Sequence, residues 1–180
     1  MIIAQEKRKT NVVEYILYMW QVEDMLRSCS FDPEKIDQLL VNQFQVDDVK
    51  RAEIAQWYKN LAAAMEMEHV LEKGHLQSLV NQVNDLNSFH LKLVLSQKDS
   101  EYIRLYQLNL EAVNDFISKS GVQFANDIEA CLNALYGYLF LKLKKSEISE
   151  STKQTVAGFA SLLGHLSARY IQFENDEFEF

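Results

Sequence analysis

Residues 49–96 read VKRAEIAQWYKNLAAAMEMEHVLEKGHLQSLVNQVNDLNSFHLKLVLS. This stretch holds no proline and one glycine, Gly74, and its apolar residues recur at spacings of three and four. That period is typical of an amphipathic helix and lacks the turn chemistry that short strands need. One straight helix of this length would span about 70 Å, whereas a globule of this size is roughly 30–40 Å across. The pattern therefore predicts a kink or break near Lys73 and Gly74, or a helix that projects as a dimer arm.

The same helical spacing continues on both sides of this stretch. In 180 residues there is one proline, Pro33, and there are five glycines. We therefore predict an all-α fold, a single-domain helical bundle of about six helices over residues 1–173, followed by a frayed acidic tail at 174–180. The expected helices start at residue 3 or 11 and end at 29, and then cover 33–44, 49–96, 100–119, 123–145 and 149–173.

Most of these boundaries carry local capping signals. Side-chain oxygens of Asp, Asn or Ser accept hydrogen bonds from the free N–H groups of a first helical turn, and a glycine in the left-handed conformation ends a helix. Pro33 suits a first helical position, where its missing N–H costs nothing. The predicted caps are Asn11, Asp32, Asp99 or Ser100, and Ser149, with Gly121 as a stop. Asp47 and Asp48 place negative charge at a helix N-terminus, where the helix macrodipole favours it.

Charge and composition exclude several classes of function. The chain has a formal net charge of −8 and a pI of about 5.0, so it repels phosphate backbones and is not expected to bind nucleic acid. Its two cysteines, Cys29 and Cys131, form no ligand or redox motif and are expected as buried thiols in a reducing compartment. Neither a signal peptide nor a membrane-spanning segment is recognisable, so we expect a cytoplasmic protein with no membrane contact.

Two of the expected helices carry small residues at helical spacing. Small faces let two helix backbones approach closely. We therefore expect the helices at 123–145 and 149–173 to form a tight antiparallel hairpin. The residues concerned are Ala130, Ala134 and Gly137 on the first, and Ala157, Ser161, Gly164 and Ala168 on the second.

One segment, residues 66–75, resembles a metal site. Two Glu-x-x-His spacings occur there, and on a helix Glu68, Glu72 and His75 fall at i, i+4 and i+7, with His69 nearby. Carboxylates and imidazoles on one helical face are what di-iron bundles use, although those sites draw ligands from several helices. The three residues are the candidate ligands of a divalent metal; a solvated helical face is the alternative.

No other chemistry emerges from the pattern. No nucleophile motif, dinucleotide fingerprint or phosphate loop is present, so we assign no catalytic residue and no organic cofactor. The run at 136–140, YGYLF, is rich in aromatic residues. Tyr136 and Tyr138 are candidates for lining a ligand pocket, although tyrosines also commonly cap a core edge with the hydroxyl in water.

Six segments of the chain carry a resemblance to a known family: residues 1–4 (MIIA), 14–21 (EYILYMWQ), 23–24 (ED), 72–76 (EKGHL), 134–139 (ALYGYL) and 147–149 (EIS). They resemble an uncharacterised bacterial family known as a domain of unknown function, DUF4924. The resemblance covers nearly the whole chain and implies an intracellular helical protein without assigned activity or site residues.

The sequence thus favours a non-enzymatic helical interaction protein that self-associates as a homodimer. The long third helical region and the wide apolar arc at residues 13–22 need more cover than one small bundle gives. A metal-binding protein or metal-dependent enzyme using the Glu/His patch is the first alternative. A small-ligand-binding bundle lined by Tyr136 and Tyr138 is the second.

Overall fold

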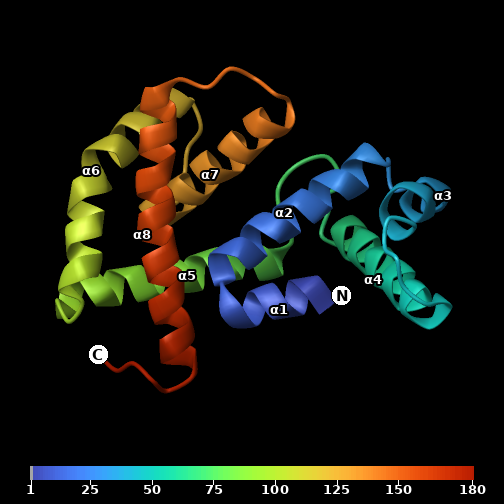
Figure 1. Ribbon diagram of the computed structural model, residues 1–180, viewed down its shortest axis with the longest axis horizontal. Helices are drawn as coiled ribbons and strands as arrows, with labels where there is room; N and C mark the ends of the chain where they lie inside the picture. Colours follow the sequence, from blue (N-terminus) through green and yellow to red (C-terminus); the bar gives the residue numbers. More distant parts are fainter. Residues whose placement is uncertain (1) are drawn as a thin grey trace. The chain divides into compact units, whose positions relative to one another are not determined.

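The computed structural model describes residues 2–180. Within them the chain forms helices and no strand, which confirms the all-α class (Figure 1). Eight α-helices and one π-helical turn replace the six helices that we predicted. Their bounds are α1 (Ile2–Thr10), α2 (Val12–Ser28), α3 (Pro33–Ile36), the π-helical turn η1 (Asp37–Val41), α4 (Asp48–Met67), α5 (Gln77–Ser96), α6 (Ser100–Ser120), α7 (Asp127–Leu143) and α8 (Glu150–Glu174).

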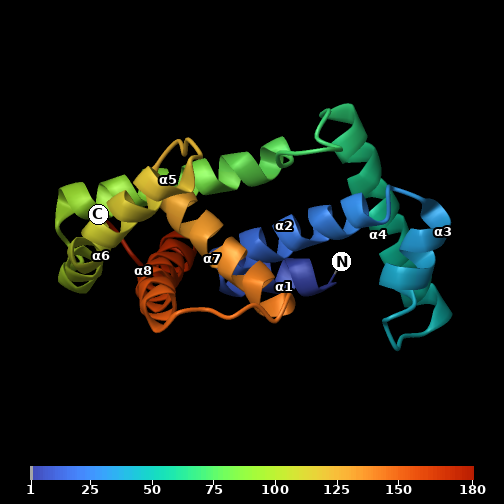
Figure 2. The same ribbon diagram turned by 90° about the horizontal axis from the view of Figure 1, so that it is seen from above.

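The two extra α-helices come from two breaks. The first lies at Asn11, between α1 and α2. The second lies at residues 68–76, where the predicted 49–96 region divides into α4 and α5 (Figure 2). His69 and Gly74 have φ values of 58° and 86° in this loop, which a continuous α-helix does not accommodate. The break expected near Gly74 is confirmed, and the projecting helical arm is wrong.

The capping signals were reliable guides to the other boundaries. Asp32 accepts from the N–H groups of Glu34 and Lys35, with Pro33 in the first turn. Further predicted caps confirmed by their hydrogen bonds are Asp99 for α6 and Ser149 for α8, and Gly121 ends α6 with φ 66°. Asp47, expected only as a favourable charge, caps α4 by accepting from the Lys50 N–H.

The chain divides into two compact units, which we describe separately. Unit 1 comprises Met1–Arg8 and Glu14–Asn81, and unit 2 comprises Lys9–Val13 and Gln82–Phe180. A single domain over 1–173 stays a prediction. The buried apolar side chains of unit 1 include Ile16, Trp20, Leu26, Ile36, Tyr58 and Met65, and those of unit 2 include Tyr102, Val113, Ile128, Leu132, Phe159 and Leu163.

In unit 2, α8 packs against both α6 and α7. The small-residue face predicted on α8 is wrong, because Ala157, Ser161, Gly164 and Ala168 are all exposed, whereas Ala130 and Ala134 on α7 are buried as expected. Helix α8 instead buries its larger residues, Phe159 and Leu163 among them. Small side chains have little apolar surface to hide, so their spacing alone does not decide which face turns inward.

None of the helices within residues 2–180 is long and apolar enough to cross a lipid bilayer. The fraying expected of residues 174–180 stays a prediction, and the last residues make ring contacts. Phe178 and Phe180 both pack against Phe89 of α5, with ring centroids 6.3 and 5.3 Å apart.

Candidate functional site

The predicted metal ligands do not lie on one helical face. Helix α4 ends at Met67, so Glu68 is its C-cap residue, whereas Glu72 and His75 belong to the loop that follows. Glu68 Oε2 accepts a hydrogen bond of 2.6 Å from the N–H of Gln77 at the start of α5. Glu72 is exposed. The i, i+4, i+7 register was wrong because the helix that it assumed is broken.

His75 is held by a residue that the sequence did not single out as a site. Its Nδ1 lies 2.6 Å from Oε2 of Glu23 on α2, and its ring stacks on Trp20 at 4.4 Å between centroids. The side chain of Glu23 is 1% exposed, and its other oxygen accepts from the N–H of Leu76 at 2.9 Å. Glu23 lies four residues after Met19, on the apolar face of α2. A carboxylate on a buried face is the signal that could have identified it.

Arg27, one turn after Glu23, completes the attachment of the loop. Its guanidinium donates to the carbonyl oxygens of Val70, Leu71 and Gly74, at 2.9 Å for Val70 and 3.3 Å for Leu71. The loop exposes these carbonyl groups because they have left the helix, and a guanidinium supplies several donors in one plane. Glu23 and Arg27 therefore fix residues 68–76 to α2.

These contacts bear on the metal hypothesis. Within residues 2–180, no group of three or more His, Cys, Asp or Glu residues is arranged to hold a metal ion. Of the candidate donors, one ring nitrogen of His75 is bound to Glu23 and one oxygen of Glu68 caps α5. Metal binding by Glu68, Glu72 and His75 stays a prediction, now without a shared helical face to support it.

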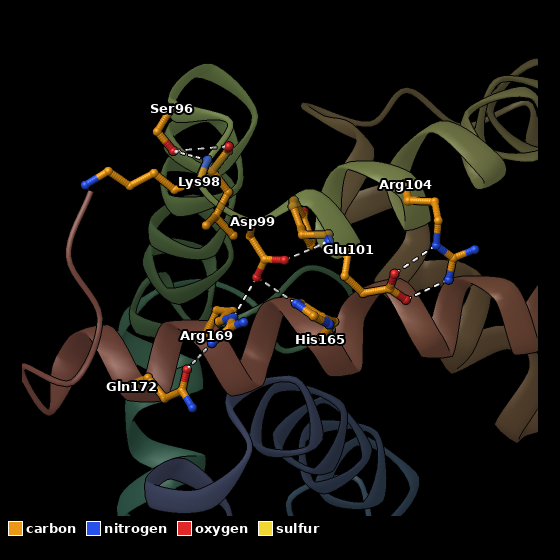
Figure 3. Close-up of polar contacts among 10 residues, drawn as sticks. Ser96, Lys98, Asp99, Glu101, Arg104, His165, Arg169 and Gln172 are labelled. Atoms are coloured by element: carbon orange, nitrogen blue, oxygen red, sulfur yellow. Dashed lines mark hydrogen bonds and ion pairs between the residues drawn. The ribbon is translucent and has the colours of Figure 1, made fainter.

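A second buried carboxylate, Asp99, organises the start of α6 in unit 2 (Figure 3). Its Oδ1 accepts from the N–H of Tyr102 at 2.9 Å. Its Oδ2 accepts from Arg169 Nε at 2.6 Å and lies 2.8 Å from His165 Nε2, both residues belonging to α8. Burial raises the pKa of Asp99, but the hydrogen bonds from His165, Tyr102 and Arg169 outweigh burial and lower that pKa to about 2. Asp99 is therefore a permanent anion that joins α6 to α8.

Neighbouring ionisable groups in unit 2 are kept neutral. Burial raises the pKa of Cys131 to about 12 and lowers the pKa of His90. His90 Nδ1 lies 2.6 Å from the hydroxyl of Tyr102, whose pKa burial also raises. A thiol with a raised pKa is a poor nucleophile, so these contacts indicate structural roles.

A hollow lies in unit 2 among α6, α7 and α8, and we call it the groove. Its volume is about 620 Å³. Tyr138 lines it, but Tyr136 does not, because residues two apart point to nearly opposite sides of a helix. The lining is mainly apolar and includes Phe116, Ala134, Gly137, Tyr138, Phe140, Leu141, Val156 and Phe159, with Asp115, Lys119, Asn133 and Thr155 as polar members.

The last turn and a half of α7 extends this apolar surface. Leu139, Phe140, Leu141 and Leu143 are all exposed, Phe140 by 49% and Leu143 by 69%. Because these residues point in different directions around the helix, the α7 end, residues 138–143, is apolar on nearly every side. A helix that is apolar all round is normally buried.

The α7 end is also basic, within an acidic chain. Lys142 Nζ lies 4.8 Å from the centre of the Tyr138 ring, and Lys144 Nζ lies 4.3 Å from that of Phe140. Lys145 follows directly, and Lys119 lines the groove while paired with Asp115 at 2.7 Å. The groove and the α7 end together form an apolar surface with a positively charged border.

Comparison with known proteins identifies a family. The model of a family described as a domain of unknown function (DUF4924) matches residues 1–177, which confirms the resemblance noted in the sequence. No curated protein and no solved structure matches the chain.

Proposed function

The chain belongs to the DUF4924 family, whose description names no activity, and we propose that it is a non-enzymatic, cytoplasmic helical interaction protein. The observation that carries this proposal is the uncovered α7 end beside the groove. Soluble proteins rarely leave contiguous large apolar surface in water, and such surface commonly marks an interaction site. Two free buried cysteines, Cys29 and Cys131, are compatible with a reducing compartment.

The partner that best fits this surface is an amphipathic helix with an acidic border. Its apolar stripe would lie in the groove against Phe140 and Leu141, as helices commonly bind in apolar grooves. Its carboxylates would face Lys142, Lys144 and Lys145. A symmetric pair of chains joined at this face would bring like charges together, because a two-fold axis places the same patch on both sides. Charge complementarity therefore favours a different, acidic protein here.

The test uses a synthetic probe instead of an unidentified partner. The probe is a helical peptide of about 18 residues, with leucines at i, i+3, i+4 and i+7 and glutamates elsewhere. A matched peptide carries lysine in place of glutamate. We expect the acidic peptide to bind about tenfold more tightly, a difference of about 1.4 kcal/mol, and its affinity to fall with added salt.

The variant Phe140→Ala/Leu141→Ala should weaken the acidic peptide about tenfold, or by about 1.4 kcal/mol. Leu91→Ala/Leu95→Ala removes two apolar side chains of α5 that are at least as exposed, and it is the control. Equal affinity for both peptides, or an equal loss in both variants, would contradict the proposal.

The groove volume supports a second candidate function, the binding of a small amphiphile. A hollow of about 620 Å³ lies within the range of small-molecule sites, roughly 300–1,000 Å³. An alkyl chain would contact Phe116 and Phe159, and an anionic head group would lie near Lys119. If a medium-chain fatty acid raises the melting temperature and the acidic peptide does not bind, this second function replaces the first.

A further inference from the structure

The C-terminal segment turns back on the helix that precedes it. Helix α8 ends at Glu174, and Asp176 adopts a left-handed φ of 59°. The N–H of Glu177 donates to the carbonyl of Gln172 at 2.8 Å, and that of Asp176 donates to Phe173. We call residues 175–180 the tail. Its sharp reversal brings Phe178 and Phe180 over α5 and α8.

The tail occupies a site made of aromatic and basic residues. The Phe180 ring lies 5.3 Å from Phe89 and 5.5 Å from Phe173, and the Phe178 ring lies 6.3 Å from Phe89. Arg169 lies 5.5 Å from the centre of the Phe178 ring, and Lys92 lies 5.8 Å from that of Phe180. We call this surface, formed by Phe89, Lys92, Arg169 and Phe173, the aromatic seat.

Charged residues also surround the aromatic contacts. The tail and the end of α8 carry four acidic residues, Glu174, Asp176, Glu177 and Glu179, all exposed. Lys98 Nζ donates to the backbone carbonyl oxygen of Glu179 at 3.5 Å, and Arg169, which lies over the Phe178 ring, is also paired with Asp99. An acidic segment with phenylalanines two residues apart thus lies on a surface of basic side chains and aromatic rings.

The attachment of the tail is shallow. Phe178 and Phe180 are only half-buried, and exposed cation–π contacts are worth roughly 0.5–1 kcal/mol each. The left-handed Asp176 adds strain to the turn that returns the tail to its own chain. Short terminal segments held by few buried contacts open far more readily than the rest of a fold.

We propose that the aromatic seat is a docking site for the tail of a second copy of this chain, so that two chains associate by exchanging residues 175–180. An exchanged tail makes the same ring and charge contacts that it makes in its own chain, and it avoids the strained reversal at Asp176. Exchange of an identical element is a low-cost route to a dimer. This surface is separate from the groove, so the two proposals stand independently.

Two complementary full-length variants test the exchange. The acceptor, Phe178→Ala/Phe180→Ala, keeps an intact seat but has no binding tail. The donor, Lys92→Glu/Lys98→Glu, keeps the tail but repels it from its own seat; both lysines are exposed, so the substitutions spare the core. Mixed at about 0.1 mM, below the millimolar effective concentration of a short tether, the two should form a 1:1 complex in sedimentation velocity.

Each variant measured alone is expected to form about tenfold less dimer than the mixture. Adding Phe178→Ala/Phe180→Ala to the donor should abolish the complex. The donor control, Lys35→Glu/Lys59→Glu, makes the same charge change on exposed residues of unit 1, and it should form no more complex with the acceptor than wild type does. Circular dichroism and melting curves establish that each variant is folded. Absence of a complex between folded donor and acceptor, or a complex that survives loss of both phenylalanines from the donor, would overturn the proposal.

Discussion

The loop at residues 68–76 in unit 1 and the α7 end in unit 2 differ in whether their side chains find partners within the chain. In the loop, charged side chains meet internal partners: Glu23 binds His75 and the Leu76 N–H, and Arg27 binds three carbonyl oxygens. At the α7 end, apolar side chains such as Phe140 and Leu143 remain in water. The charged groups that hold the loop are therefore already bonded within the chain, whereas the apolar side chains of the α7 end are available to a partner.

This contrast shows which surface is the better place to look for function. Glutamate and histidine drew attention to the loop because they ligate metals, yet a buried polar group also needs a partner simply to be tolerated. An exposed apolar helix end has no such structural explanation. Substitutions in the loop should therefore reduce stability, whereas substitutions at the α7 end should reduce binding.

Removing the carboxylate that holds the loop should have the largest effect. Glu23→Ala leaves the Leu76 N–H and the His75 ring without their acceptor, so we expect the free energy of unfolding to fall by about 3 kcal/mol. Glu23→Gln, which keeps one acceptor oxygen, should lose less. Urea unfolding followed by tryptophan fluorescence measures both; a loss below about 1 kcal/mol for the alanine variant would mean that the loop is not held as described.

The contribution of Asp99 to the stability of unit 2 should depend on pH. The pKa of Asp99 is lowered from 3.8 to about 2, so its contribution is complete above pH 4 and is lost as the pH falls through 2. We expect the free energy of unfolding of wild type to exceed that of Asp99→Asn by about 2 kcal/mol at pH 6, since one pKa unit corresponds to 1.36 kcal/mol. This difference should disappear near pH 2. A gap independent of pH would argue against an ionised anchor.

Substitutions at two glycines should distinguish the backbone of the 68–76 loop from an ordinary helix surface. Gly74 has a φ of 86°, so Gly74→Ala should cost about 1–2 kcal/mol. Gly164 is helical and exposed, with open space around it, so Gly164→Ala should stabilise by about 0.5–1 kcal/mol. Thermal unfolding of both variants provides the measurement. A melting temperature that shifts in the same direction in both would contradict the different backbone conformations assigned to the two glycines.

Substitutions at the α7 end should barely change stability. Phe140→Ser and Leu143→Ser replace exposed side chains, so the free energy of unfolding should stay within about 0.5 kcal/mol of wild type. Binding of the acidic probe peptide should nevertheless fall. If either variant unfolded as readily as Glu23→Ala, the α7 end would belong to the core and the contrast with the loop would fail.

Chelation should have the smallest effect of all. Glu68 and His75 make internal hydrogen bonds, and a bound metal would stabilise the fold by mass action. Plasma mass spectrometry of the untagged protein and melting curves with and without EDTA test this point. We expect metal well below one atom per chain and an unchanged melting temperature; stoichiometric metal lost in Glu72→Ala and His75→Ala would reinstate the site.

The sequence was most informative where structure depends on neighbouring residues. The caps at Asp32, Asp99 and Ser149 could be predicted because a side chain there bonds to N–H groups two or three positions later. The division of α4 from α5 was only partly predictable, since Glu23 and Arg27 stabilise that loop from about 50 residues away.

The candidate sites were harder to predict than the fold. Apolar periodicity continues across residues 68–76, which made Glu68, Glu72 and His75 resemble one helical face. The run at 136–140 indicated a ligand surface, but of its two tyrosines only Tyr138 lines the groove. Which side of a helix is covered depends on tertiary packing. The period of a sequence identifies the apolar face of a helix but not the element that packs against it.

The most direct test of the interaction surface is a residue-resolved titration of isotope-labelled protein with the acidic amphipathic peptide, followed by amide chemical shifts. We predict saturable changes at the α7 end and along the groove, at residues such as Phe140, Leu141 and Thr155, with no change in the 68–76 loop. Changes centred on that loop, or none anywhere at saturating peptide, would contradict the account.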